Sequence, residues 1–207
     1  MGAFIVFEGG DGSGKGTQVR ILKNRLSKEG HSVVATYEPG GTALGEAARR
    51  WLKTRADLTH LAELLLFEAA RAQLVEKVIS PALASHQIVV CDRFYTSTVA
   101  YQGYGRGLDL GLIQRLNEAA ADGVRPDLTV LLDIPAEIGL ARKRGGRADS
   151  FESEAVEFHK RVREGYRAQA SQDVDSWCVL DGTQDRRVLA ARIWERVQPL
   201  LSHKRGD

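Results

Sequence analysis

Five short runs of apolar residues recur along the chain, separated by longer amphipathic stretches. The runs cover Phe4–Glu8, Ser32–Tyr37, Ile88–Asp92, Leu128–Asp133 and Trp177–Asp181. They lack the apolar–polar alternation of a sheet that has one face in water, so they predict strands covered on both sides. Strands of this kind are typical of parallel sheets whose connecting helices pack on both faces.

The segments between these runs carry apolar residues at three- and four-residue spacing, which is the period of a helix. The stripes are Val19, Leu22 and Leu26; Leu110, Ile113 and Leu116, behind Asp109 as an N-cap; Phe158, Val162 and Tyr166; and Leu189, Ile193 and Val197. Strand and helix patterns thus alternate, which predicts a three-layer α/β fold with about five parallel strands. The length of 207 residues, without an internal repeat or low-complexity linker, favours one domain over residues 1–207.

Composition narrows the class of protein. Hydrophobic residues make up 43% of the chain and charged residues 27%, which is enough for a substantial core. The net charge of +2 gives no electrostatic argument for a nucleic-acid partner. We expect a soluble, cytoplasmic protein, because no leader or membrane-length apolar run is present. Cys91 and Cys178 lie in apolar runs and should be reduced and buried, whereas the five scattered histidines should lie on the surface or in loops.

The first predicted strand runs directly into Gly9-Gly10-Asp11-Gly12-Ser13-Gly14-Lys15-Gly16-Thr17. Glycines let such a turn wrap with its N–H groups pointing inward, and the next helix adds the positive end of its dipole. Lys15 at this spacing is expected to reach the β- and γ-phosphates of a nucleoside triphosphate. The pattern therefore predicts nucleotide binding, although Gly16 stands where Ser or Thr usually holds Mg²⁺ and Thr17 follows one position late.

Charged residues follow the strands at the edge where parallel sheets bind ligands. Asp92 and Arg93 end the third run, Glu38 follows the second, and Asp133 ends the fourth. Beside a phosphate loop, Asp92 suits Mg²⁺ or its waters, and Arg93 can bind a phosphate through two parallel hydrogen bonds. A structural Asp–Arg pair that only caps a loop is the alternative.

Three further features are ambiguous on the residues alone. Ala141-Arg142-Lys143-Arg144-Gly145-Gly146-Arg147 combines four cations with two glycines, which suits a lid over about residues 142–152, or a solvated basic loop. Phe67 and Arg71 share a helix face and could stack on and hydrogen-bond a base, but a core Phe beside a surface Arg is the favoured interpretation. The same holds for Tyr101 and Gln102.

Several longer motifs stand in order along the chain. They are Asp92-Arg93-Phe94-Tyr95-Thr96-Ser97-Thr98-Val99-Ala100-Tyr101-Gln102, then Gly103-Tyr104-Gly105-Arg106-Gly107, with Glu38-Pro39-Gly40-Gly41-Thr42, Gly45-Glu46 to Arg49 and Pro126-Asp127-Leu128. In these motifs the chain resembles the thymidylate kinase family over nearly its whole length. The resemblance implies a P-loop nucleoside monophosphate kinase in dTTP synthesis. Such an enzyme transfers the γ-phosphoryl of ATP reversibly to dTMP with the help of Mg²⁺ and works as a homodimer.

The resemblance also implies which residues act. ATP would be bound by Gly9, Gly10, Asp11, Gly12, Ser13, Gly14, Lys15, Gly16, Thr17 and Arg142. dTMP would be bound by Asp11, Glu38, Arg49, Phe67, Arg71, Arg93, Ser97, Tyr101 and Gln102. The catalytic residues would be Lys15, Asp92, Arg93, Arg144 and Arg147, with Asp92 and Thr17 near the metal.

In more detail, the resemblance implies that Asp11 contacts the 3′-hydroxyl of the acceptor. Phe67 would stack on thymine while Arg71 and Gln102 hydrogen-bond its edge. Tyr101 would crowd the 2′ position of the sugar. Because the phosphate loop has no arginine between Asp11 and Lys15, the chain is similar to the family branch with arginines in the lid.

Three positions depart from the family pattern: Gly16, Tyr37 where Arg is common before Glu38, and Ser150 where Arg is common in the lid. Gly14-Lys15-Gly16-Thr17-Gln18 looks more like an adenylate kinase loop, so a kinase for AMP, UMP or CMP is the nearest alternative. A nucleotide-dependent switch that hydrolyses ATP slowly is the alternative from another class. A guanine switch is disfavoured, because neither Asn24 nor Asn117 begins an Asn-Lys-x-Asp motif.

Overall fold

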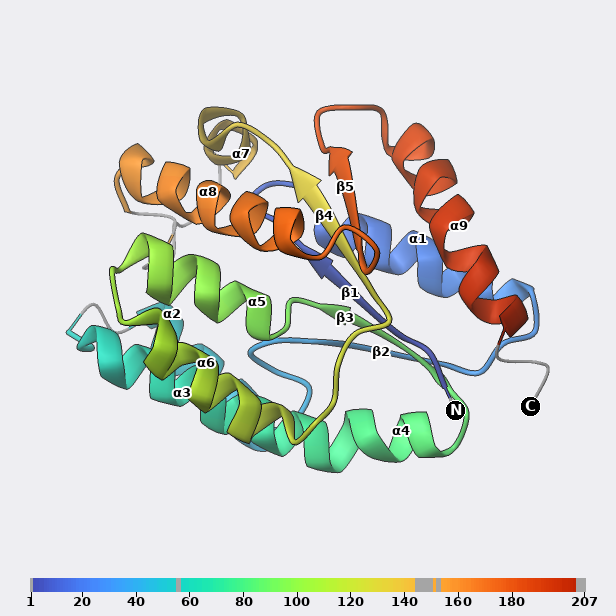
Figure 1. Cartoon of the computed structure of the whole chain (residues 1–207), viewed down its shortest axis with the longest axis horizontal. Coiled ribbons are helices and arrows are strands. Elements are labelled where there is room, and N and C mark those ends of the chain that lie inside the picture. Colours follow the sequence, from blue (N-terminus) through green and yellow to red (C-terminus); the bar gives the residue numbers. More distant parts are fainter. Residues whose placement is uncertain (1, 55–56, 144–150, 152–153, 204–207) are drawn as a thin grey trace.

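The five apolar runs form one parallel sheet with helices on both of its faces (Figure 1). The structure, a computed structural model, describes residues 2–54, 57–143, 151 and 154–203. The strands are β1 (Phe4–Glu8), β2 (Val33–Tyr37), β3 (Ile88–Asp92), β4 (Leu128–Asp133) and β5 (Trp177–Asp181). They pair in parallel in the order β2-β3-β1-β4-β5. The predicted α/β class and strand number are confirmed, and the second strand begins at Val33 rather than Ser32.

Helical segments connect the strands. They are α1 (Lys15–Lys28), α2 (Ala43–Thr54), α3 (His60–Leu74), η1 (Val75–Ile79), α4 (Ser80–Ala84), α5 (Tyr95–Thr98), η2 (Val99–Gly105), α6 (Leu110–Ala121), α7 (Ala136–Lys143), α8 (Val156–Gln172) and α9 (Arg186–His203), of which η1 and η2 are π-helical. None of the helices in the described ranges is long and apolar enough to cross a bilayer.

The two faces of β1 explain why its apolar run is continuous. Ile5 and Phe7 pack with residues of α1 and α9 on one face. Phe4 and Val6 pack on the other face with the end of α3, with η1 and with Phe94. Every residue of β1 is buried, so neither face has a solvent-exposed position that would call for a polar residue.

Most of the predicted helix stripes are buried as expected. Phe158, Val162 and Tyr166 of α8 pack against β4 and η2, and Leu189, Ile193 and Val197 of α9 join the α1 side of the core. Leu110 is an exception, because it is the first residue of α6, beyond the edge of the core, and is 46% exposed. Asp109 caps α6 as predicted, accepting a hydrogen bond from the Leu112 N–H at 2.7 Å.

Cys91 and Cys178 are buried and unbridged in the described part of the chain, as predicted. The expectation that all histidines lie on the surface or in loops is wrong for His159. This residue is buried in α8 and packs edge-on against the Phe158 ring, with centroids 5.3 Å apart. α8 fills the space between η2 and the sheet, so the side of α8 that carries His159 turns inward.

The glycine-rich turn after β1 packs directly on α7. A Cβ on Gly12 would lie 2.1 Å from the Gly139 carbonyl oxygen, and one on Gly139 would lie 2.3 Å from the Asp11 carbonyl oxygen. Both distances are too short for a real Cβ, so backbone meets backbone here. The parallel pairing also brings the end of β3 beside the end of β1, with Phe7 opposite Asp92. The turn, α7 and the Asp92–Arg93 pair therefore share one edge of the sheet.

Candidate active site

The glycine-rich turn forms a cradle at the start of α1. Gly9, Gly12 and Gly14 have φ of 138°, 72° and 94°, in the left-handed region that favours glycine. The Lys15 ammonium donates hydrogen bonds to the carbonyls of Gly9 and Gly10 at 2.9 and 3.0 Å. Burial, together with the charge of the nearby Arg93, lowers the pKa of Lys15 to about 8. Lys15 is thus a desolvated cation at a helix N-terminus, where an anion is stabilised.

A cavity opens above this cradle. Its lining includes the turn itself, Asp92 at the end of β3 and Arg142 of α7. Arg142 donates to the carbonyls of Gly12 at 3.4 Å and Gly182 at 3.1 Å, so it joins the turn to the segment after β5. Gly16 faces Asp92, since a Cβ on Gly16 would lie 3.5 Å from a carboxylate oxygen of Asp92. A hydroxyl at position 16 would therefore stand beside Asp92, and the chain lacks it.

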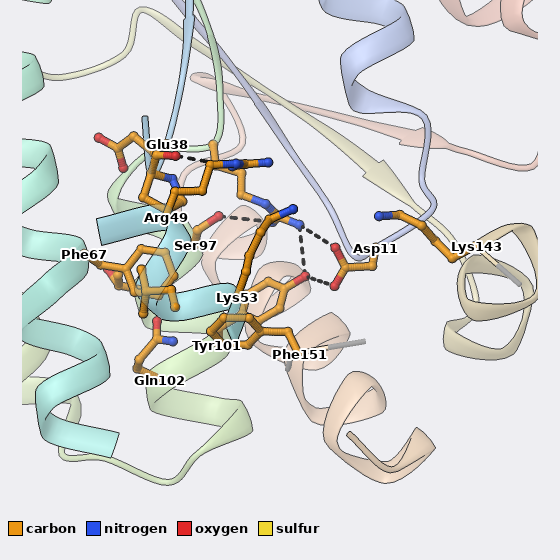
Figure 2. Close-up of a pocket in the computed structure, with 14 residues that line it drawn as sticks. Asp11, Glu38, Arg49, Lys53, Phe67, Ser97, Tyr101, Gln102, Lys143 and Phe151 are labelled. Carbon is orange, nitrogen blue, oxygen red and sulfur yellow. Dashed lines mark hydrogen bonds and ion pairs between the residues drawn. The ribbon is translucent and has the colours of Figure 1, made fainter. Parts of the chain in front are cut away.

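A deep pocket adjoins this cavity (Figure 2). Its empty space, including the open mouth, amounts to about 680 Å³. The residues that line both spaces are Asp11, Glu38, Arg49, Arg93 and Lys143. The two spaces therefore meet at a boundary made of charged side chains, three of them basic and two acidic.

Among the residues of this boundary, Arg93 is held by a network of hydrogen bonds. Its guanidinium donates hydrogen bonds to the Gly9 carbonyl (3.1 Å), the hydroxyls of Ser97 (3.3 Å), Tyr166 (2.9 Å) and Tyr101 (3.0 Å), and an Asp11 carboxylate oxygen (3.2 Å). The Arg93 backbone has φ of 74°, which residues other than glycine rarely adopt and which costs on the order of 1–3 kcal/mol. So many partners fix the guanidinium between the two spaces despite this strain.

A buried carboxylate beneath Arg93 was not identified from the sequence. Glu8, at the end of β1, is 0% exposed. It accepts hydrogen bonds from the Phe94 N–H (2.9 Å) and from the hydroxyls of Thr96 (2.7 Å), Ser97 (2.7 Å) and Tyr166 (2.8 Å). Phe94 directly follows Arg93 in the chain, and the hydroxyls of Ser97 and Tyr166 that bind Glu8 also accept hydrogen bonds from the Arg93 guanidinium. Glu8 therefore holds together the turn that presents Arg93.

Aromatic residues form the walls of the deep pocket. Phe67 of α3 and Tyr101 of η2 each lie with ring centroids 6.0 Å from Phe151. Figure 2 shows Phe67 on the side of the pocket away from Asp11, and the amide of Gln102 at its lower end. The Tyr101 hydroxyl donates to Asp11 at 2.9 Å, and this bond links the aromatic wall to the glycine-rich turn. The pocket therefore suits a ligand with a flat ring that packs on the aromatic side chains, a polar edge that meets Gln102, and an anionic group that lies near Arg93.

Arg71 differs from both sequence interpretations. It is 1% exposed, so the expectation of a surface arginine is wrong. It is also absent from the described residues that line the pocket. Its guanidinium donates to the carboxylates of Glu38 (3.0 Å), which follows β2, and of Glu68 (2.6 Å), one turn earlier on α3, and to the Asn117 carbonyl (2.7 Å) of α6. Burial raises the pKa of Glu38 to about 7 even beside this cation.

The amide of Gln102 is held from behind by a second buried ion pair. Gln102 donates to a Glu63 oxygen at 2.8 Å, and both Glu63 oxygens also accept from Arg106, at 3.3 and 3.2 Å. Arg106 further pairs with Glu154 and lies over the ring of Phe158. Neither Glu63 nor Arg106 was predicted as a site residue from the sequence. The only sequence signal for Glu63 is its four-residue spacing from Phe67 on one helix, and this spacing is too common in helices to mark a functional residue.

The remaining predicted residues are distributed as follows. Arg49 of α2 lines both spaces and donates to the Pro39 carbonyl at 3.2 Å, with the Tyr37 ring 5.2 Å away. Thr17 lines the cavity above the cradle. Lys53, which had no role predicted from the sequence, and Lys143, one of the cations of the predicted lid, line the deep pocket. Arg144, Arg147 and Ser150, with most of the expected lid, lie outside the described residues.

Comparison with known proteins gives consistent matches. The family model for thymidylate kinase matches residues 7–193. A thymidylate kinase of Synechococcus sp. (strain JA-3-3Ab) is 52% identical over 198 residues, covering 96% of each chain. A thymidylate kinase of Geotalea uraniireducens (strain Rf4) is 47% identical, covering 98% of this chain and 99% of the relative. The crystal structure of thymidylate kinase from Ehrlichia chaffeensis superposes with a TM-score of 0.74 at 40% identity, covering 86% of this chain and 92% of that one.

Proposed function

The chain belongs to the thymidylate kinase family, and we propose that its cavity above the cradle holds ATP while the deep pocket holds dTMP. It is an enzyme that transfers the γ-phosphoryl of ATP reversibly to dTMP, giving ADP and dTDP, as the family does. The observation that supports this assignment of ATP and dTMP is that the two spaces share a boundary of charged side chains. A donor phosphate and an acceptor phosphate placed on either side of Arg93 would face each other there.

The side chains at this boundary suit transfer between two anions. The acceptor phosphate is already an anionic nucleophile, so the reaction needs alignment and charge neutralisation rather than a general base. We assign Lys15 to the β- and γ-phosphates and Arg93 to the transferred group and the acceptor phosphate, with Arg49 assisting. Lys15 and Arg93 are each held by several hydrogen bonds before substrate arrives, which limits the reorganisation that accompanies the reaction.

In the deep pocket, we propose that Phe67 stacks on thymine and Gln102 bonds its edge. Tyr101 and Asp11, which are bonded to each other, would face the sugar, and Ser97 and Glu38 would lie beside it. A bond from Arg71 to the base stays a prediction, since its guanidinium already serves Glu38, Glu68 and Asn117. Arg71 would have to share one of these bonds.

The residues present fit a Mg²⁺ ion that is held mainly by the triphosphate. Within the described ranges, no group of three or more His, Cys, Asp or Glu residues could hold a metal by itself. Mg²⁺ bound with nucleotides characteristically uses one or two carboxylates and keeps several waters. Asp92 supplies such a carboxylate, and Thr17 or water would replace the hydroxyl that Gly16 lacks. When bound, the ion neutralises charge on the phosphate oxygens.

We retain the expectations of one kinase domain over residues 1–207 and of lid arginines, Arg144 and Arg147, that complete the charge around the γ-phosphate. The absence of arginine between Asp11 and Lys15 supports this lid assignment. A cytoplasmic location suits both the nucleotide substrates and the free cysteines, Cys91 and Cys178.

ADP release from ATP tests this function. Separate reactions would contain dTMP, dUMP, AMP, UMP, CMP or no acceptor, each with Mg²⁺ or with excess EDTA. We expect release only with Mg²⁺, and more with dTMP than with AMP or CMP, because the aromatic walls and Gln102 fit the edge of thymine. dUMP carries the same edge, so its rate measures what the 5-methyl group of thymine contributes. Preference for AMP would show that the adenylate-kinase-like loop was the better guide. Release without acceptor would move the chain to the ATPases.

We also propose a homodimer through the paired outer faces of α2 and α3. Leu44, Leu61 and Leu65 are each 46% exposed there, on helices that pack together through Ala48, Leu52 and Ala70. Leu65→Glu should therefore reduce the mass measured by light scattering from about twice 22.7 kDa to about 22.7 kDa.

The matched control for the dimer is Val188→Glu. Val188 is 48% exposed on α9, which covers the opposite face of the sheet, so its change should leave the doubled mass intact. A Leu65→Glu protein that keeps the doubled mass would place the interface elsewhere.

A further inference from the structure

The pocket contains an amide whose orientation is fixed from behind. Gln102 is buried, and its amide lies at the lower end of the pocket (Figure 2). Its nitrogen donates to Glu63 at 2.8 Å, on the side away from the ligand space. Glu63 is buried too, and it does not line the pocket among the described residues. Glu63 therefore acts on any ligand through Gln102.

Hydrogen-bond chemistry determines which end of the amide faces Glu63. A guanidinium has donors only, and Arg106 donates to both Glu63 oxygens, so these oxygens are acceptors. The group of Gln102 that meets Glu63 must then be its NH₂, because two acceptors cannot share a bond. The carbonyl oxygen of Gln102 is left for the pocket. Reversing the amide would place two oxygens together in a buried site, which is costly.

We infer that Glu63, held by Arg106, is a positioning residue that sets base specificity: it fixes Gln102 so that an acceptor faces the pocket. This inference rests on the proposed function, in which Gln102 meets the pyrimidine edge. Thymine carries an N–H at N3 and can donate to that acceptor. Cytosine has a bare N3 and would face it with a lone pair. The Glu63–Arg106 ion pair thus favours thymine over cytosine without contacting the base itself.

The test compares the native enzyme with Glu63→Gln. An amide at position 63 can present either its oxygen or its NH₂, so Gln102 becomes free to reverse and accept cytosine. The measurement is kcat/KM for dTMP and for dCMP at saturating ATP. We expect the ratio of the two values to fall by at least about tenfold, because one directed hydrogen bond is lost. Glu63→Asp keeps two acceptors, so it should retain the native ratio at lower activity.

The matched control is Glu154→Gln, which alters the other carboxylate bound to Arg106 and should leave the ratio unchanged. Equal losses for both substrates in Glu63→Gln would reduce Glu63 to a packing role and overturn the inference. A loss of the ratio in Glu63→Asp would overturn it as well, and this variant decides the matter should Glu63→Gln fail to fold. A native enzyme inactive on dTMP would instead refute the proposed function.

Discussion

Replacing Arg93 by alanine is expected to lower kcat by about 10³-fold or more, the magnitude known for arginines that stabilise a transferring phosphoryl group. The guanidinium is the group best placed to meet both phosphates, since it lies on the boundary of the two spaces. Its hydrogen bonds to Tyr101, Tyr166 and Ser97 hold it in position before substrate arrives. Steady-state kinetics with saturating ATP and dTMP measure the effect.

Two further measurements make the Arg93 result specific. ATP affinity, followed by calorimetry without acceptor, should change little, because the cradle and Lys15 remain. Arg93→Lys keeps a positive charge but cannot form two parallel hydrogen bonds, so it should recover only a small part of the rate. Near-normal turnover in Arg93→Ala would remove Arg93 from the reaction. A collapse of ATP affinity would show that it belongs to the donor site alone.

Lys15→Met is expected to weaken ATP binding and to lower kcat by about 10³-fold, since a preorganised cation at the phosphates typically contributes several kcal/mol to transition-state stabilisation. Lys15 is held by the carbonyls of Gly9 and Gly10, so the free protein keeps the ammonium in place. Methionine preserves the length of the side chain and removes its charge. Unchanged turnover would contradict the assignment.

The lowered pKa of Lys15 adds a pH signature. Because this pKa is about 8 in the free protein and the triphosphate requires the charged form, ATP affinity should fall as pH rises above 8. Below that pH the ammonium is already charged, so affinity should be nearly flat there. Lys15→Met should lose this decline. A decline that persists in the variant would assign it to another group.

Strands were the most predictable part of the fold. The central strands β1, β3 and β4 are covered on both faces, so burial alone dictates a continuous apolar run such as Phe4–Glu8. The edge strands β2 and β5 are partly exposed, so the expectation of cover on both sides is wrong for them, although their apolar runs were still recognisable. The phosphate loop was equally visible, since its chemistry is contained in nine consecutive residues. Local spacing and local chemistry account for both successes.

Buried charges were not predictable in the same way. Glu8 meets Tyr166, which is 158 residues away, and Arg71 meets Glu38 and Asn117 across three elements. In the sequence each is an ordinary charged residue whose default place is the surface. Only the folded chain shows the partners that make burial tolerable. The functional network around Arg93 and Gln102 therefore had to be found from the structure.

The contact between Gly12 and Gly139 has a mechanical consequence. Backbone packed on backbone has no side-chain rotamers with which to accommodate a displacement. The phosphate turn and α7 should therefore move together as one rigid unit. The bend that allows this movement would then lie outside this pair, for example at Ile134–Pro135 before α7. A nucleotide that shifts the turn should therefore also shift Arg142 and Lys143, which end α7.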